Sequence, residues 1–137
     1  MKEFELIATW FKDSSCNRSD VHLGVGDDAA LISLDNDQEL ITASASEPYQ
    51  TCATPEQMAN NCYHNALESL LKQRATPAWA MLCLCLGEVE SAWIGGFASE
   101  LFKCMQVDDV QLIGGDTTAG PTQATLFLSG YRLRSET

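Results

Sequence analysis

The feature that most constrains the fold is an uninterrupted apolar run, Ala78–Leu86 (AWAMLCLCL), which directly follows Pro77. The run is far too short to cross a bilayer, which takes about 20 apolar residues. A short run without a polar face, entered through a proline, is typical of a strand that is covered on both sides. The sequence therefore predicts a buried strand here, with other parts of the structure packed against each of its faces.

Hydrophobic periodicity divides the rest of the chain into helices and strands. Thr54 can cap a helix whose first position is Pro55, and an apolar stripe follows at helical spacing. The pair Gly95-Gly96 lies inside a second helix, which predicts a backbone packed closely against a sheet, because each Gly costs roughly 1 kcal/mol relative to Ala. The predicted helices cover 2–12, 55–73 and 90–105, and the predicted strands lie near 21–25, 29–33, 39–45, 78–86, 109–113 and 124–133. This order predicts an α+β fold, a mixed β-sheet with helices packed on one face, as a single domain over residues 1–137.

Composition limits the partners and the compartment. The chain has 8 Lys and Arg against 19 Asp and Glu, a net charge of −11, which repels nucleic-acid phosphates and anionic lipid. We therefore expect no nucleic-acid partner and no membrane association. The start of the chain lacks the basic and apolar regions of a signal peptide, so we expect a cytoplasmic protein with its cysteines reduced. Cys83 and Cys85 are predicted to share one strand face as core thiols, and no cysteine spacing indicates a zinc site.

Two glycine–aspartate motifs carry the candidate chemistry. The first, Gly24–Ala30 (GVGDDAA), places Asp27 and Asp28 beside glycines that let the chain turn, and such carboxylate oxygens suit Mg²⁺. The second, Gly114–Pro121 (GGDTTAGP), follows a predicted strand and could present backbone N–H groups and hydroxyls to phosphate, with Asp116 on a metal. Taken alone, each motif is more typical of a plain solvated turn than of a binding site.

Taken together, the motifs resemble the N-terminal domain of the thiamine-monophosphate kinases, in the superfamily of aminoimidazole-ribonucleotide synthetase and selenophosphate synthetase. The matching stretches follow the order and spacing of the family; they are Glu3–Ala8, Leu23–Leu31, Pro77–Trp79, Ala92-Trp93, Gln111–Thr118 and Gly120-Pro121. The resemblance implies an α/β sandwich whose sheet pairs with that of a second subunit in a homodimer. It also implies phosphorylation of thiamine monophosphate with ATP and Mg²⁺ as cofactors.

The same resemblance implies roles for individual residues. By motif match, Asp27 and Asp116 are metal ligands and Asp28 assists them. Gly115, Thr117 and Thr118 are implied to lie near the phosphates of a bound nucleotide, which makes this second motif the nucleotide-binding part of the site.

Three departures from the family pattern bear on catalysis. Ser44 stands where the family has the aspartate of Thr-Asp-Thr. Ser69 stands where the helix segment Ser-Asp-Leu-Ala-Ala-Met-Gly-Ala has its aspartate, and Lys72 and Arg74 add cations nearby. The C-terminal domain of the family, which supplies much of the active-site cleft, is absent from this chain.

We therefore expect no catalytic residues in this chain and no activity from it alone, because two Mg²⁺ ions need several carboxylates. Glu47 or Glu68 could swing in as a substitute, although Glu68 is about 100° around the helix from the family position. The sequence favours a non-catalytic, dimerising domain with at most weak ATP and Mg²⁺ binding. Two alternatives stay open: part of a thiamine-monophosphate kinase completed by a C-terminal domain, or a protein-interaction module that docks through its sheet.

Overall fold

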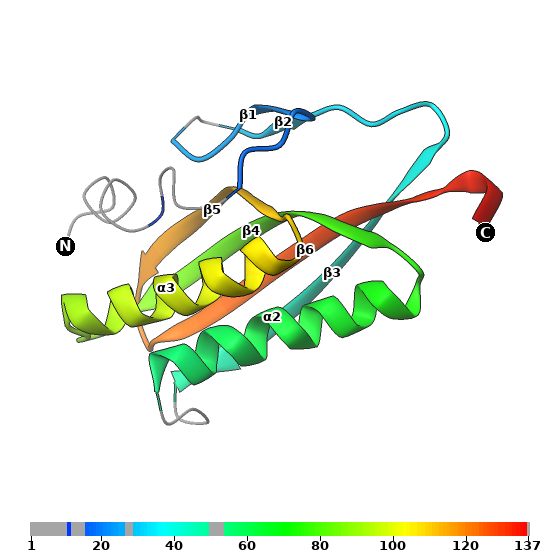
Figure 1. Ribbon diagram of the computed structural model, residues 1–137. Coiled ribbons are helices and arrows are strands. Elements are labelled where there is room, and N and C mark those ends of the chain that lie inside the picture. The colour runs from blue at the N-terminus through cyan, green and yellow to red at the C-terminus, as the bar shows by residue number, and fades with distance from the viewer. Residues whose placement is uncertain (1–10, 12–15, 27–28, 50–53, 137) are drawn as a thin grey trace.

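A computed structural model describes residues 11, 16–26, 29–49 and 54–136 (Figure 1). The elements are β1 (Val21–Leu23), β2 (Leu31–Ile32), β3 (Gln38–Pro48), α2 (Pro55–Lys72), β4 (Thr76–Leu86), α3 (Ser91–Val107), β5 (Gln111–Ala119), β6 (Gln123–Leu133) and the short 3₁₀ helix η3 (Arg134–Glu136). The helix predicted over 2–12 lies outside the described residues. The predicted fold class is confirmed: a mixed sheet carries helices on one face.

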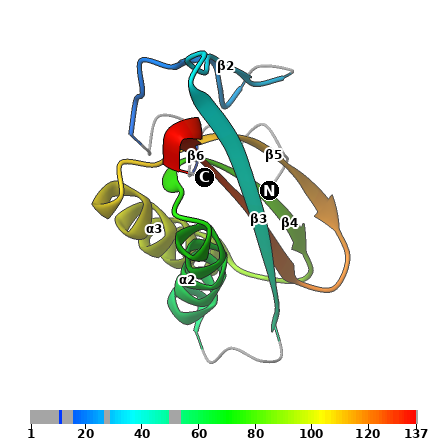
Figure 2. The ribbon, with the colours of Figure 1, turned by 90° about the vertical axis from the view of Figure 1, so that its right-hand side faces the viewer.

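The sheet has four strands in the order β3-β6-β4-β5. Strands β4 and β5 are parallel and are connected through α3, whereas β6 runs antiparallel to both of its neighbours, β3 and β4. Figure 2 shows α2 and α3 on one side of the sheet; on the other side, the part of the chain that the structure describes has no α-helix. Strands β1 and β2 form a separate two-stranded ribbon at one end of the sheet.

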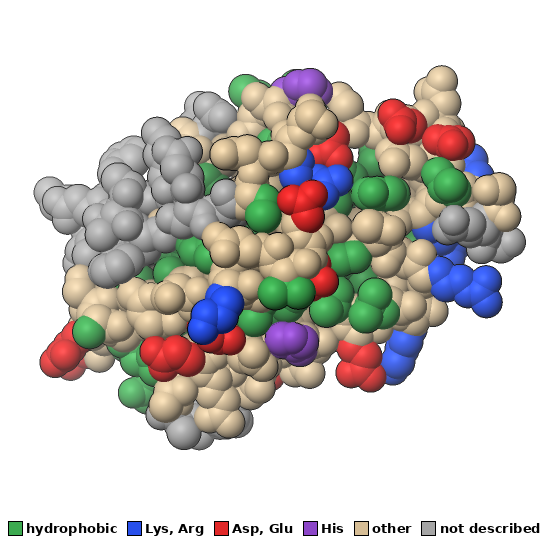
Figure 3. Space-filling view, in the orientation of Figure 1, with side chains coloured by type: hydrophobic (Ala, Val, Ile, Leu, Met, Phe, Trp, Pro, Cys, Tyr) green, Lys and Arg blue, Asp and Glu red, His purple; other side chains and the backbone are tan. Residues whose placement is uncertain are grey.

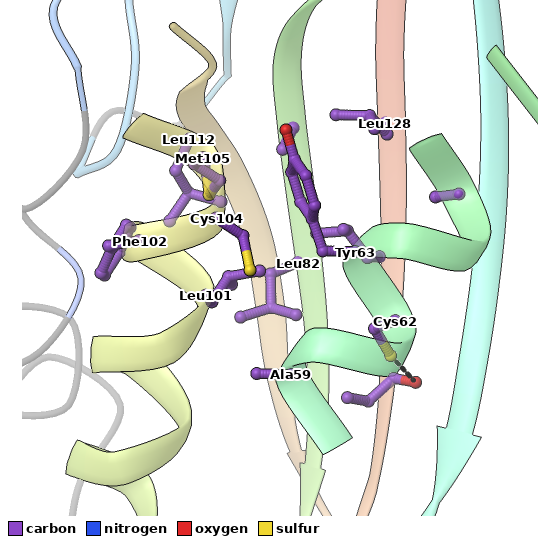
Figure 4. Packing of buried hydrophobic residues seen from close by; sticks show 14 of the residues in the cluster. Ala59, Cys62, Tyr63, Leu82, Leu101, Phe102, Cys104, Met105, Leu112 and Leu128 are labelled. Carbon is purple, nitrogen blue, oxygen red and sulfur yellow. Dashed lines mark hydrogen bonds between the residues drawn. The ribbon is translucent and has the colours of Figure 1, made fainter. Parts of the chain in front are cut away.

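The main core lies between the sheet and the two helices (Figure 4). Alternate residues of the strands point toward the helices, as Leu82 of β4 and Leu126 of β6 do, and they meet Tyr63 of α2 and Leu101 of α3. Tyr63, Leu101 and Leu126 are completely buried. Removing such apolar surface from water is the main stabilising term of a fold of this size.

Helix α2 begins as its sequence predicts. The Thr54 hydroxyl oxygen accepts a hydrogen bond from the backbone N–H of Gln57 at 3.1 Å, and Pro55 occupies the first helical position. The close approach predicted at Gly96 is present, but its partner is not a strand. A Cβ on Gly96 would lie 3.3 Å from the Pro55 ring and would overlap the Glu56 carboxylate, so the glycine lets α3 pack on the first turn of α2.

The prediction that β4 is covered on both sides holds for the first part of the strand, where the successive residues 77–80 are all buried, but within the described part of this chain it is wrong from Met81 onward. Leu82 and Leu84 point into the helix-covered core, whereas Met81 is 41 % exposed and Cys83 and Cys85 are only half-buried on the opposite face. The expectation of core thiols at Cys83 and Cys85 fails for the same reason. Among the described residues, the second face of this apolar strand is therefore covered at its start and open from Met81 to Cys85.

Replacing Arg74 by Gly is expected to stabilise the domain by about 1 kcal/mol. Arg74 follows the last turn of α2 with φ +61°, and its N–H donates to the Leu71 carbonyl while that of Ala75 donates to the Leu70 carbonyl. This helix-ending geometry favours glycine, because a Cβ crowds the backbone in the left-handed region. Urea unfolding of the variant measures the effect. An Arg74→Ala variant is the control, because it removes the side chain but keeps the Cβ and should not gain this stability.

Candidate functional site

The second motif does not form the turn that the sequence suggests. Residues 114–119 continue strand β5 alongside β4, with Cys83 opposite Asp116. Gly115 has φ +150°, and the β4–β5 register shifts nearby, between Ala80 and Met81. The motif is therefore an irregular edge strand, and it does not surround a ligand with backbone N–H groups as a phosphate-binding loop does.

Asp116 is exposed on this edge strand. Its Oδ1 atom accepts a hydrogen bond from the backbone N–H of Thr117 at 2.9 Å. Thr117 is half-buried and Thr118 is exposed. An exposed carboxylate beside two hydroxyl side chains offers oxygen ligands to a hard cation. Among the residues that the structure describes, however, no group of three or more acidic, histidine or cysteine side chains is placed to hold a metal ion.

Asp27 and Asp28, the carboxylates of the first motif, lie outside the described residues. The preceding segment, Gly24–Gly26, is described and lies beside the start of β5: a Cβ on Gly24 would be 3.5 Å from Nε2 of Gln111. Gln111 precedes Asp116 by about 16 Å of strand. The described residues therefore bring both motifs to the same strand, β5, but to different points along it.

The two serines at the departure positions lie far from Asp116. Ser44 is on β3, at the opposite edge of the sheet, in register with Phe127 of β6. Two strands separate it from β5, a distance of about 14 Å. Ser69 is exposed on α2, and its hydroxyl donates to the Asn65 carbonyl of the same helix at 3.5 Å.

The glutamates considered as substitute ligands have other contacts. Oε1 of Glu47 accepts a hydrogen bond from Asn65 at 3.1 Å, and Glu68 pairs with Lys72 at 3.4 Å. Glu47 is on β3, across the sheet from Asp116, and Glu68 is on the outer surface of α2. Neither carboxylate is placed to replace a ligand next to Asp116.

Arg18 is at the centre of a polar cluster that the sequence did not predict. Its guanidinium donates to both carboxylate oxygens of Asp20, at 3.1 Å from Nε and 3.0 Å from Nη2. Nη1 donates to the Asp109 carbonyl at 2.8 Å, and the backbone N–H of Arg18 donates to Oε1 of Gln111 at 2.6 Å. The guanidinium also lies 5.7 Å from the ring centre of Trp79, whose indole N–H donates to Asp20 at 3.1 Å.

This cluster joins segments that are far apart in the sequence: the start of the β1–β2 ribbon, the beginning of β4, and the turn between α3 and β5. The Arg18 side chain is only 14 % exposed. The signal available in the sequence was an arginine three residues before a strand in a strongly acidic chain, inside a segment interpreted as a polar loop.

Acidification below about pH 4 is expected to weaken this cluster. Burial raises the pKa of Asp20, but hydrogen bonds from Arg18 and Trp79 outweigh that effect and leave the pKa below its usual value. A lowered pKa in the folded state gives stability that is present above the unfolded-state pKa and is lost as the pH falls through the folded-state pKa. Urea unfolding at pH 7 and pH 3 measures the loss. An Asp20→Asn variant should lose less stability than the unmodified protein over this interval, and an equal loss would contradict the prediction.

A second polar cluster links the two helices. The Tyr63 hydroxyl donates to Asp108 at 2.6 Å, and Nδ2 of Asn60 donates to Glu100 at 3.1 Å. Burial, and then the nearby Glu100, raise the pKa of the Cys104 thiol to about 11, so it is protonated at neutral pH. This cluster satisfies polar groups between helices and holds the thiol in its less reactive form.

Comparison with known proteins places these features in a family. The family described as AIR synthase related protein, N-terminal domain, matches residues 26–131, which include strands β2 to β5, most of β6, and the motif aspartates Asp27 and Asp116. The chain belongs to this family. It is homologous to the N-terminal part of thiamine-monophosphate kinase. The resemblance predicted from the sequence motifs is therefore confirmed.

The relatives show how far the likeness extends. The thiamine-monophosphate kinase of Escherichia coli K12 is 38% identical over 133 residues, which cover 94% of this chain and 41% of the relative. The crystal structure of thiamine-monophosphate kinase from Stenotrophomonas maltophilia K279a is 30% identical with a TM-score of 0.78, covering 86% of this chain and 39% of that one. The hydrogenase maturation protein HypE, solved in complex with ATP, shares the fold at 16% identity and a TM-score of 0.80, covering 97% of this chain and 41% of that one.

The chain thus spans about two-fifths of the length of these relatives. Within the described part of the chain, neither α2 nor α3 is long and apolar enough to cross a membrane.

Proposed function

We propose that this chain acts as a non-catalytic, dimerising domain of the thiamine-monophosphate kinase type, with weak binding of ATP and Mg²⁺ at Asp116 and the first motif. The open face of the sheet supports this proposal most directly.

The open face presents apolar side chains from three neighbouring strands. Leu40 of β3 is 52 % exposed, Phe127 of β6 40 % and Met81 of β4 41 %. Phe127 lies directly opposite Met81 in the β4–β6 register, so these two form one continuous patch. A contiguous apolar patch on a rigid sheet is typical of a protein interface. A second copy of this chain is the proposed occupant, because the uniformly apolar β4 sequence fits a strand covered on both faces.

The helical side of the molecule looks different. Figure 3, which views that side, shows acidic and basic side chains scattered over the helices and the adjoining surface. Charged side chains are depleted at the centres of protein interfaces. The helical side is therefore the less suitable of the two faces for pairing.

The absence of catalysis is proposed from the positions of the carboxylates. Phosphoryl transfer needs metal ions held against the phosphates by several anionic ligands. Among the described residues, Asp116 belongs to no group of three or more acidic, histidine or cysteine side chains that could hold a metal ion, and Ser44 and Ser69 carry no charge. The proposed cation is therefore a single, weakly bound ion that enters with its nucleotide.

Sedimentation at micromolar concentration tests the dimer. The unmodified chain should have twice its 15.0 kDa mass, and Phe127→Asp should sediment as a monomer, because the new charge would be buried between copies. Leu71→Asp is the matched control: Leu71 is a similarly exposed apolar residue, 55 % exposed, on the outer surface of α2. Monomeric wild-type protein would overturn the dimer. Dissociation by Leu71→Asp alone would move the interface to the helical side.

Calorimetry tests the nucleotide. A non-hydrolysable ATP analogue with Mg²⁺ should bind with a dissociation constant in the high micromolar to millimolar range, and Asp116→Asn should weaken it at least tenfold. Asp35→Asn, in the exposed turn before β3, is the control for a general loss of negative charge. Absence of heat up to millimolar ligand would remove the nucleotide from the proposal. Turnover of thiamine monophosphate by the purified chain would overturn its non-catalytic character.

A second candidate function is one half of a thiamine-monophosphate kinase whose remaining domain completes the site. The 38% identity to an enzyme of that name favours this candidate. Adding a separately produced C-terminal part of such a kinase to this chain should then produce thiamine-monophosphate phosphorylation. Failure of every such mixture would leave the non-catalytic function in place.

A further inference from the structure

The β1–β2 ribbon needs an anchor outside itself. Strand β1 has three residues and β2 has two, joined by an irregular register. An isolated two-stranded ribbon is marginally stable at best in water, and this one is shorter than most. Its position must therefore be set by contacts with the body of the domain.

Apolar contacts supply only part of that anchor. Val21 and Ile32, one from each strand of the ribbon, are partly buried against a small cluster formed by Ala78, Trp79 and Ile113 at the end of the sheet. Leu23 and Leu31 are exposed. One partly buried side chain from each strand does not fix the orientation of the ribbon relative to the sheet, because apolar contacts are not directional.

The Arg18 cluster supplies the directional part. The guanidinium fork binds both oxygens of Asp20, the Arg18 carbonyl accepts from the backbone N–H of Val21 at 3.3 Å, and the Asp20 carbonyl accepts from that of Ser33 at 2.8 Å. The first residue of β1 and the residue that directly follows β2 are thus bonded to Arg18 and Asp20, the two residues joined by the guanidinium. The guanidinium of Arg18 donates to the Asp109 carbonyl, and the backbone N–H of Arg18 donates to the Gln111 side chain, so Arg18 is bonded to the body of the domain at two points.

The described part of the first motif, Gly24–Gly26, directly follows strand β1 of the ribbon. Gly24 follows β1 directly, and its Cα faces the side chain of Gln111, the same side chain that accepts the Arg18 N–H. The ribbon's attachment therefore determines where the chain enters the motif relative to β5, the strand that holds Asp116.

We propose that Arg18 is the positioning residue of the first motif: its guanidinium fork, together with Asp20 and Gln111, holds the Val21–Gly26 segment against β5, and the affinity for magnesium nucleotide depends on that placement. This inference rests on the proposed function. The planar fork is needed because Lys would keep the charge but could not bind both Asp20 oxygens and the Asp109 carbonyl in one fixed geometry.

Arg18→Lys tests the proposal with two separate readouts on the full chain. Hydrogen exchange of amides in residues 18–26 should accelerate at least tenfold, while the central strands β4 and β6 keep their protection. The dissociation constant for Mg²⁺ with a non-hydrolysable ATP analogue should rise at least tenfold. Arg134→Lys is the matched control: the exposed Arg134 donates from Nε to the Asn36 carbonyl at 3.2 Å, and its replacement should change neither readout.

Gln111→Ala is a milder second variant, because it removes the acceptor of the Arg18 N–H and leaves the fork with Asp20 intact. It should move both readouts in the same direction by a smaller factor. If both variants keep wild-type exchange rates in residues 18–26, the anchoring is overturned. If the wild type binds nucleotide and Arg18→Lys binds it equally well, the positioning role is overturned while the proposed function stands. If the wild type binds no nucleotide, the proposed nucleotide function fails together with the affinity part, and exchange alone decides the anchoring.

Discussion

Replacing Gly115 by Ala is expected to lower the free energy of unfolding by about 3 kcal/mol or more. An added Cβ would overlap the carbonyl oxygen of Leu82 and lie 2.7 Å from its carbonyl carbon. These are backbone atoms of the central strand β4, which is paired on both sides and cannot move away cheaply. The backbone at Gly115 also has φ +150°, which side-chain-bearing residues rarely adopt.

Gly114→Ala is the matched control, one residue earlier in the same strand. A Cβ there would meet only the terminal methyl of Met81, at an ordinary contact distance of 3.8 Å. Its effect should stay within about 0.5 kcal/mol, the usual range for a substitution without a clash. Urea unfolding of both variants measures the difference. Equal stabilities would show that β5 does not approach β4 as closely as described.

Replacing Gly130 by Ala should have the next largest effect, a loss of about 2–3 kcal/mol. Gly130 is in β6 opposite Pro77, where the β4–β6 register shifts between Pro77 and Trp79. A Cβ would overlap the Thr76 carbonyl oxygen and lie 3.1 Å from the Pro77 Cα atom. Proline at this point restricts the backbone that would have to move, so the clash cannot be relieved locally.

Ser129→Ala is the control for Gly130. The Ser129 hydroxyl donates to Thr42 at 3.0 Å across the exposed part of the sheet. Losing one such hydrogen bond should cost about 0.5–1 kcal/mol. Thermal unfolding should therefore rank Gly130→Ala well below Ser129→Ala in midpoint temperature, and the reverse order would refute the proposed close approach of β6 and β4.

Much of the fold was predictable because its signals are local. The helix predicted at 55–73 is α2 at Pro55–Lys72, since a capping threonine, a proline at the first position and a long apolar stripe all specify the same segment. The strand predicted at 124–133 is β6 at Gln123–Leu133. Strand β5 was predicted too short because the pair Gly114-Gly115 is typical of a turn. In the structure both glycines pair with β4, and the strand continues beyond them.

The candidate site also has features that the sequence predicts and features that it does not. Its aspartates and threonines could be identified because Gly-Asp motifs are short and contiguous. Their arrangement could not, because it depends on which strands are neighbours: Ser44 and Asp116 lie on opposite edges of one sheet. The Arg18 cluster could not be predicted because its partners Asp109 and Gln111 are more than 90 residues away in the sequence. No local sequence pattern indicates a contact over such a separation.

The amino-acid order alone determined helices α2 and α3, most of the described strands, the acidity of the chain and its family, because periodicity, caps and motifs are properties of residues close together in sequence. Only the tertiary structure decided that β4 keeps one apolar face open, that the second motif stays within a strand, and that one arginine fork joins the β1–β2 ribbon to the sheet. Each of these follows from backbone pairing and side-chain contacts between residues distant in sequence, and those contacts exist only once the layers have packed.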